Sequence, residues 1–408
     1  MRILSLVFIG FLAVGLSACG QETPSAAEKA RALAQAAIIV DTHVDLPYRL
    51  EEGGWEDVSV PTLKGDFDYP RAREGGLNAP FMSIYTPADL GDGAEATANA
   101  ERLIDLMEKV VASAPDKFAL AYSPDEVEHN FAAGLISLPL GMENGSPIAG
   151  ELANLQHFYD RGIRYITLTH SKSNHISDSS YDANKQWGGL SPFGEEVVRE
   201  MNRLGIMVDI SHVSDEAFWD ALAISEAPLI ASHSSLRHFT PGLERNMSDE
   251  MVKALAGKGG IIMINFGSFF LTEAAHQAGE AYDGAYEAYR AGRGLDDTPE
   301  AKAAFEAEFY GEAGYPYATL EDVLDHFDRA IEVAGVDHVG IGSDFDGVED
   351  TLPIGLKDVS QYPNLIEGLL RRGHSEEDVR KILSGNILRV WREVEAAAAR
   401  LQASEEIP

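Results

Sequence analysis

The chain has 408 residues, 45% of them hydrophobic, and its 66 acidic and 32 basic side chains give a formal net charge of −34. This charge repels phosphate backbones and anionic lipid head groups, which argues against nucleic-acid binding and against binding of membranes through basic residues. The single cysteine excludes an intrachain disulfide, thiolate zinc ribbons and iron–sulfur clusters. Any metal must therefore be held by His, Asp and Glu.

The first twenty residues have the pattern of an export signal. Met1 and Arg2 precede an apolar run over residues 3–16, which is shorter than the roughly 20 residues that a membrane span needs. The run ends in Leu-Ser-Ala-Cys, which resembles the bacterial lipoprotein box whose cysteine becomes the lipid-modified first residue. We expect a signal peptide at 1–18 and a tether at 19–36; a plain signal peptide cleaved after Ala18 is the alternative.

Lipid on Cys19 would anchor the exported chain to a bacterial membrane, because several acyl chains together bind stably. No Asp follows Cys19. In lipoproteins this usually implies the periplasmic side of the outer membrane, which is the expected location.

Eight apolar, β-branched runs follow the tether, and a loop and a helical pattern come after nearly every one. Their almost continuous apolar character is typical of parallel strands that are buried on both faces. No Gly-rich phosphate turn follows the first run, which favours a TIM-type (β/α)8 barrel over an open doubly wound sheet. We expect one α/β domain over residues 37–400, with strands at Ile38–Thr42, Phe81–Tyr85, Leu135–Met142, Arg164–Thr169, Ile206–Ser211, Leu229–Ser232, Ile261–Phe266 and Val339–Ser343.

Residues 267–318 are too long for an ordinary connection and are rich in Ala, Glu and Tyr. They predict a helical insertion before the eighth strand. A lid, a dimer contact and a solvated surface excursion all remain open for it. Two further helical patterns, at 364–372 and 375–399, are expected to pack outside the barrel.

Polar residues follow most of the predicted strands. Active sites of such barrels gather at the carboxyl ends of the strands. After the first strand, His43 and Asp45 are two residues apart and point to the same side in extended chain. One such His alone is more often structural, and one Asp more often caps a helix. The convergence of the set favours a site, which continues with Glu143, His170, His212, His233 and Asp344.

This donor set predicts a metal centre without thiolates. Imidazoles and carboxylates favour Zn²⁺, with Mn²⁺ or Co²⁺ as substitutes that the same ligands accept. The ligands are too many for one catalytic zinc, so we expect two metals bridged by Glu143. The pair would share a hydroxide that acts as nucleophile at neutral pH.

At this point the sequence resembles the membrane dipeptidase (renal dipeptidase) family of the amidohydrolase superfamily. The resemblance covers about residues 36–395. It rests on matches in order at residues 41–47 (DTHVDLP), 81–87 (FMSIYTP), 164–171 (RYITLTHS), 189–194 (GLSPFG), 208–214 (VDISHVS), 232–235 (SHSS), 245–246 (RN), 342–347 (GSDFDG) and 358–359 (DV).

The resemblance implies a binuclear zinc barrel that cleaves L-Xaa-L-Xaa and L-Xaa-D-Xaa dipeptides by attack of the bridging hydroxide, often as a homodimer. His43 and Asp45 would bind the first zinc and His212 and His233 the second, with Glu143 between them.

The resemblance also assigns roles around the metals. His170 would hydrogen-bond the scissile carbonyl oxygen, and Asp344 would carry the proton from the attacking water to the leaving amine. Arg245 would hold the substrate carboxylate, unless it forms a surface ion pair. Asp209 would orient a ligand without touching the metal.

The chain departs from the family pattern in two places. Tyr48 stands where Trp is frequent, so the wall of the substrate pocket is expected to differ. Asn144 stands where Gly is frequent, and Asn tolerates the positive φ that this turn needs.

Two alternatives to the dipeptidase remain open at this stage. The same site could open a lactone or cleave a non-peptide amide or an N-acyl amino acid. The second alternative is not an enzyme but a non-catalytic lipoprotein that binds peptides in the cell envelope.

Overall fold

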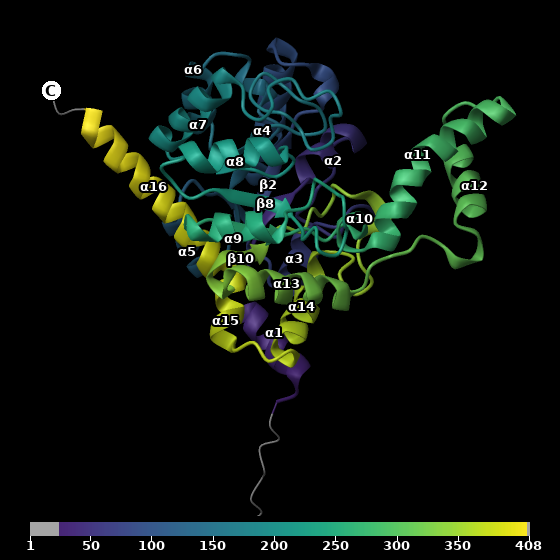
Figure 1. Ribbon diagram of the computed structural model, residues 1–408. Coiled ribbons are helices and arrows are strands. Elements are labelled where there is room, and N and C mark those ends of the chain that lie inside the picture. The colour runs from purple at the N-terminus through teal and green to yellow at the C-terminus, as the bar shows by residue number, and fades with distance from the viewer. Residues whose placement is uncertain (1–23, 406–408) are drawn as a thin grey trace, which may run out of the picture.

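The computed structural model describes residues 24–405, and in it eight parallel strands form a nearly closed barrel surrounded by helices (Figure 1). The predicted (β/α)8 barrel is confirmed. Each of the eight predicted runs overlaps one barrel strand, and the signal peptide and Cys19 lie outside the described residues. In spatial order the strands are β1 Val40–Val44, β2 Ala79–Tyr85, β5 Leu140–Glu143, β6 Ile163–Thr167, β7 Met207–Asp209, β8 Ile230–Ser234, β9 Ile261–Ile264 and β10 Val339–Ile341.

The third predicted strand, Leu135–Met142, is wrong in its extent, because this run forms two strands. Its first part, β4 (Ile136–Leu138), leaves the barrel and pairs with β3 (Phe118–Leu120) in a separate two-stranded sheet. Pro139 separates β4 from β5, since proline has no amide hydrogen to donate to a ladder. The sequence did not predict β3, which is short and only half-buried after Phe118.

The barrel closes between its first and last strands just beyond the end of β10. The amide of Asp344 donates to the carbonyl of His43 at 3.1 Å, and the amide of Asp45 donates to the carbonyl of Phe345 at 2.8 Å. Closure therefore happens at the carboxyl ends of the strands. It brings the polar residues that follow β1 and β10 to one place.

Helices surround the barrel, and serine side chains fix where several of them begin. The hydroxyls of Ser123, Ser191, Ser214 and Ser248 accept hydrogen bonds from backbone amides in the first turns of α5, α7, α8 and α9. The helices around the barrel are α2 Leu46–Gly53, α3 Tyr69–Gly75, α4 Ala94–Ser113, α5 Pro124–Ala132, α6 Ala153–Asp160, α7 Pro192–Leu204, α8 Asp215–Ile224 and α9 Asp249–Gly257 before the insertion, and α13 Leu320–Ala334 and α14 Tyr362–Arg371 after it.

The end of the predicted tether is part of the folded domain. Residues Ala26–Ala36 form α1, which packs against α14 and buries Ala30, Leu33 and Ala34. None of the described helices has the combined length and apolar character that a membrane crossing requires.

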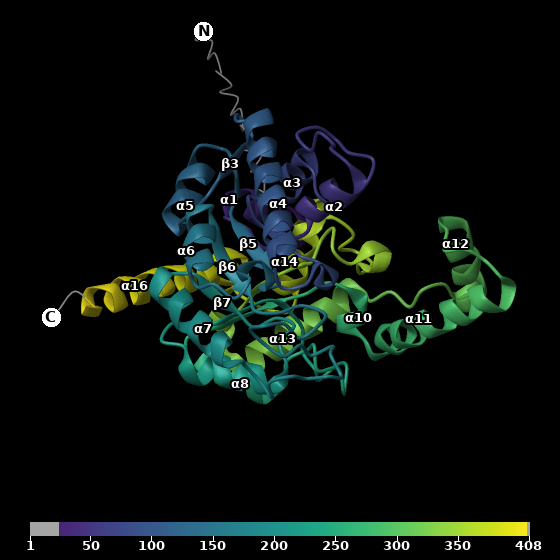
Figure 2. The ribbon, with the colours of Figure 1, turned by 90° about the horizontal axis from the view of Figure 1, so that it is seen from above.

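Residues 267–318 contain α10 (Ser268–Leu271), α11 (Glu273–Arg293) and α12 (Pro299–Phe309). In both views α11 and α12 form a hairpin that projects away from the barrel (Figure 2). Aromatic side chains hold the hairpin together, with Phe305 only 4% exposed and packed 5.2 Å from the ring of Tyr282.

The C-terminal segment covers the amino end of the barrel. It consists of α15 (Glu376–Arg380), a π-helical turn (Lys381–Gly385) and α16 (Asn386–Glu405). Trp391 of α16 is fully buried and packs 5.3 Å from the ring of Phe81, in an apolar cluster that includes the first residues of several strands. The helix therefore lies outside the barrel, as expected, and seals the end opposite the polar strand ends.

Trp391→Ala tests how much this seal contributes to stability. Loss of a fully buried aromatic side chain should cost about 3–5 kcal/mol of unfolding free energy, measured by urea denaturation. The control is Trp219→Ala, because Trp219 on α8 is 39% exposed and should lose far less. Equal losses in the two variants would contradict the role of α16.

Candidate metal centre

His43 leaves β1 with both ring nitrogens in defined surroundings. Its Nδ1 lies 2.9 Å from the hydroxyl of Tyr165, and its Nε2 lies 3.4 Å from a carboxylate oxygen of Asp45 and of Glu143. Burial lowers the pKa of His43, but Tyr165 and the two carboxylates outweigh burial and raise this pKa well above its ordinary value. Tyr165 fixes the ring from behind and so aims Nε2 at the carboxylates.

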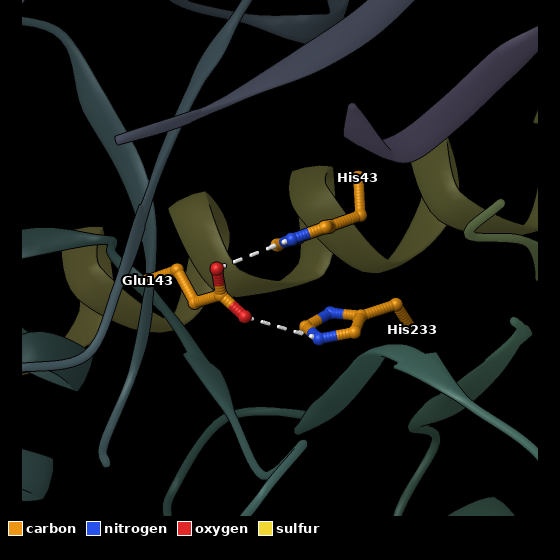
Figure 3. A group of neighbouring side chains, drawn as sticks. All are labelled: His43, Glu143 and His233. Atoms are coloured by element: carbon orange, nitrogen blue, oxygen red, sulfur yellow. Dashed lines mark ion pairs between the residues drawn. The ribbon is translucent and has the colours of Figure 1, made fainter. Parts of the chain in front are cut away.

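Glu143 ends β5 and faces imidazoles with both of its oxygens. Its Oε2 is 3.4 Å from His43, while its Oε1 is 3.2 Å from Nε2 of His212 and of His233. Figure 3 shows His43 and His233 approaching opposite oxygens of the carboxylate. Burial alone would raise the pKa of Glu143, but the neighbouring imidazoles, His43 first among them, hold it well below its ordinary value.

His212 and His233 follow β7 and β8 and point at the same spot. Their Nε2 atoms are 2.7 Å apart. Burial lowers the pKa of both side chains well below the ordinary histidine value, which favours neutral rings that carry a lone pair. Two neutral imidazole nitrogens beside an ionised carboxylate are a donor set that suits a divalent cation.

Asp209 reaches this donor set through a serine. Its Oδ2 accepts a hydrogen bond from the hydroxyl of Ser232 at 2.6 Å, and the same hydroxyl lies 2.8 Å from Nδ1 of His233. Asp209 also accepts the amide of Ser211 at 3.1 Å. The carboxylate thus orients the ring of His233 and the backbone before His212 without approaching the donor atoms.

Asp344 lies in the segment that follows the last strand, β10, and completes the ring of carboxylates. Its backbone has φ of 67°, and its Oδ2 accepts a hydrogen bond from the side-chain amide of Asn265 at 2.7 Å. Its Oδ1 lies 3.9 Å from Nε2 of His43. Burial raises the pKa of Asp344 to about 7, although His43 opposes the shift.

His170 and Arg245 lie beside the cluster. Nε2 of His170 is 3.6 Å from Oε1 of Glu143, and burial lowers its pKa. Arg245 is 3% exposed and donates to the hydroxyl of Ser234 at 2.8 Å and to the carbonyl of His233 at 2.6 Å. Arg245 is therefore buried, and it does not form the surface ion pair that was the alternative interpretation of this residue.

A cavity of about 420 Å³ opens above the cluster. Tyr48 of α2 forms part of its wall and packs edge-on against Tyr85 with ring centroids 5.2 Å apart. Sequence reasoning missed Tyr85, Tyr181 and Phe270. Of these, only Tyr85 could have been found by its position at the carboxyl end of a strand, because it is the last residue of β2. The lining residues are Asp45, Tyr48, Tyr85, Glu143, His170, Ser171, Tyr181, His212, Phe270, Asp344, Gly347 and Val348.

Every site residue predicted within the described part of the chain lies in or against this cluster. The turn after Glu143 is as expected, with Asn144 at φ of 74°. Three overlapping sets of side chains have their donor atoms within 4.8 Å of one another, so the residues fit divalent cations. The sets are His43, Glu143 and His233; Glu143, His170 and His212; and His43, Asp45 and Asp344.

Comparison with known proteins decides the family. The sequence profile described as membrane dipeptidase, peptidase family M19, matches residues 27–405. The chain belongs to the membrane dipeptidase family. It is accordingly a metal-dependent dipeptidase of that family, and the interpretation as a non-catalytic binding protein loses its support.

Solved structures agree with this assignment. A probable dipeptidase, PvdM, from Pseudomonas aeruginosa is 27% identical, with 91% of this chain and 99% of that chain covered and a TM-score of 0.78. A metallopeptidase from Rhodobacter sphaeroides, bound to a phosphinate mimic of the dipeptide L-Ala-D-Ala, is 26% identical, with 88% and 99% covered and a TM-score of 0.72. A further dipeptidase of the family, dipeptidase AC, is 26% identical, with 88% and 98% covered and a TM-score of 0.72.

Gly347→Ala tests the close approach of two carboxylates at this site. A Cβ on Gly347 would lie 2.2 Å from Oδ2 of Asp45 and 2.4 Å from Oδ1 of Asp344, so both must move. A misplacement of about 1 Å can cost about 100-fold in catalysis. Because the two carboxylates must move to make room for the Cβ, dipeptide hydrolysis should fall by at least tenfold.

The melting temperature of this variant should stay near that of the parent, since residue 347 is exposed. Gly257→Ala is the matched control, with nothing within 4 Å of the added Cβ. Full activity of Gly347→Ala would show that neither carboxylate position matters.

Proposed function

We propose that this dipeptidase works with two zinc ions per chain and cleaves both L-Xaa-L-Xaa and L-Xaa-D-Xaa dipeptides. The observation that carries the proposal is Glu143, whose two oxygens face separate imidazole groups at 3.2–3.4 Å. His43 and Asp45 would hold one ion and His212 and His233 the other. Mn²⁺ or Co²⁺ would be accepted by the same donors.

The bound cations would supply an activated water and polarise the peptide carbonyl. Asp344 would accept a proton from the attacking water at Oδ1, and this role is supported by the hydrogen bond from Asn265 that already engages Oδ2. The same oxygen would then deliver the proton to the leaving amine. Nε2 of His170 would donate to the carbonyl oxygen as negative charge develops on it.

Arg245 would bind the carboxylate of the substrate. Its terminal nitrogens donate to Ser234 and to the carbonyl of His233, and one of them also lies 3.0 Å from Nε2 of His212, while its Nε is buried and donates to no described residue. That donor and the fixed positive charge suit a carboxylate. Tyr48 and Tyr85, which line the cavity, would flank the side chain of the dipeptide.

Acceptance of a D-residue at the C-terminal position is part of the proposal. It is supported by the relative from Rhodobacter sphaeroides, which binds a mimic of L-Ala-D-Ala and matches 88% of this chain. The resemblance also implies a homodimer, which we keep as part of the proposal.

We further propose that Cys19 carries the lipid that holds the exported enzyme at the periplasmic side of the outer membrane. The support is the lipoprotein box at residues 16–19, which contains the only cysteine of the chain. Cys19→Ser should move the activity from the membrane fraction to the soluble fraction. Unchanged membrane association would remove this part of the proposal.

A dipeptide panel with L- and D-residues at the C-terminal position tests the substrate class. The zinc-loaded enzyme should hydrolyse members of both series. Inactivity across the panel, together with hydrolysis of lactones, other amides or N-acyl amino acids, would favour the alternative substrates instead.

Asp344→Asn tests the proton transfer. The variant should keep its zinc content and lose much more than tenfold in turnover, since its amide cannot accept and return the proton. A loss within about tenfold, equivalent to about 1.4 kcal/mol of barrier, would contradict the role. Asp337→Asn, at a surface ion pair with Lys381, is the matched control and should keep full activity.

A further inference from the structure

A second cavity, of about 540 Å³, lies between the helical insertion and the loop that follows β10. This volume is typical of sites for small ligands. The cavity borders the active site, because Phe269 and Glu349 line it while their chain neighbours Phe270 and Val348 line the metal-site cavity. Nothing in the proposed reaction uses it.

Tyrosine rings form much of its wall. Tyr282 and Tyr310 are nearly parallel, with centroids 6.1 Å apart at 20°, and Tyr315 meets Tyr310 edge-on at 5.5 Å. The faces of such rings attract cations. One already does so here, because Nζ of Lys357 lies 3.7 Å from the ring centroid of Tyr317.

Glu306 is the acid of this cavity that forms no ion pair in the described part of the chain, although Lys302 lies near enough for Glu306 to help raise the pKa of that lysine. Glu349 and Asp350 also line it, but they pair with Lys302 at 3.0 Å and with Lys357 at 3.1 Å. Among the described residues, no ion pair includes Glu306, whose only side-chain hydrogen bond comes from the hydroxyl of Tyr282 at 2.9 Å.

The negative charge of Glu306 also affects the tyrosines around it. Glu306 is half-buried on α12, and its carboxylate adds to burial in raising the pKa of Tyr310. A half-buried carboxylate among aromatic rings is an arrangement that favours an organic cation over an anion or a neutral group.

We propose that this cavity binds a protonated amine or a guanidinium carried on an aliphatic chain. Glu306 pairs with the cationic group, and the tyrosine rings cover the chain. The cation has two sources. It is either a free amine or, resting on the proposed dipeptidase function, the basic side chain of a dipeptide whose peptide bond lies in the neighbouring cavity.

Calorimetric titration of the zinc-loaded enzyme with pentylammonium, and with pentanol as neutral match, tests the chemistry. Pentylammonium should bind saturably and at least about tenfold more tightly than pentanol, and Glu306→Gln should remove that difference. Glu308→Gln is the matched control on the same helix, because Glu308 pairs with Arg293 at 2.9 Å instead. The affinity of the Glu308→Gln variant for pentylammonium should stay within about twofold of that of the parent enzyme.

Lys302→Met gives a result of opposite sign that loss of folding cannot produce. This substitution removes the ammonium group of Lys302, which competes with the ligand in the cavity wall, and leaves the carboxylate of Glu349 without its ion pair. Pentylammonium should therefore bind several-fold more tightly. No saturable binding, equal binding of pentanol, or an equal loss in Glu306→Gln and Glu308→Gln would overturn the proposal.

Paired dipeptides that carry lysine or norleucine distinguish the two sources. If the substrate supplies the cation, kcat/KM should favour lysine over norleucine, and Glu306→Gln should abolish the preference while Glu308→Gln keeps it. Pentylammonium binding without such a preference assigns the cavity to a free amine. Failure to hydrolyse any dipeptide would count against the proposed substrate class and leave the binding result standing.

Discussion

The structure depends on one buried carboxylate held between imidazole rings. Glu143 is 4% exposed, and burial of an ionised carboxylate costs several kcal/mol unless opposite charge or hydrogen bonds compensate. Three ring nitrogens within 3.4 Å of its oxygens provide part of that compensation, and Ser83 adds a hydrogen bond at 3.3 Å. His212 and His233 are closely spaced and burial lowers the pKa of both, so divalent cations are the natural complement of this arrangement.

The barrel is what makes such a concentration of polar groups tolerable. Its strands are buried along their length, and Trp391 covers the amino end, so the apolar core and the polar groups lie at different levels of the barrel. The polar groups then extend beyond the strand ends, where backbone turns with positive φ at Asn144, His212 and Asp344 direct them inward. These strained turns concentrate at the site, as expected where function overrides local preference.

The strand-end histidines and carboxylates could be predicted from the sequence because each directly follows a continuous apolar run, and parallel strands bring such positions together. Tyr165, Ser232 and Asn265 could not, because each contacts a residue far away in the sequence, and no local pattern encodes such a contact. The partners are His43, Asp209 and Asp344. The split of β4 from β5 depended on a single proline inside an otherwise convincing run. The insertion was recognisable by its length and composition, but its aromatic cavity depends on packing between α11, α12 and the loop after β10.

Metal content and affinity of Glu143→Gln test the central claim most directly. Equilibrium dialysis against buffered zinc, followed by elemental analysis, should give two zinc ions per chain for the parent enzyme. The variant should lose affinity for both ions together, because Glu143 holds both ions in the proposed centre. A Glu143→Gln chain that keeps one zinc ion at the parent's affinity, or a parent chain that binds only one, would contradict the account.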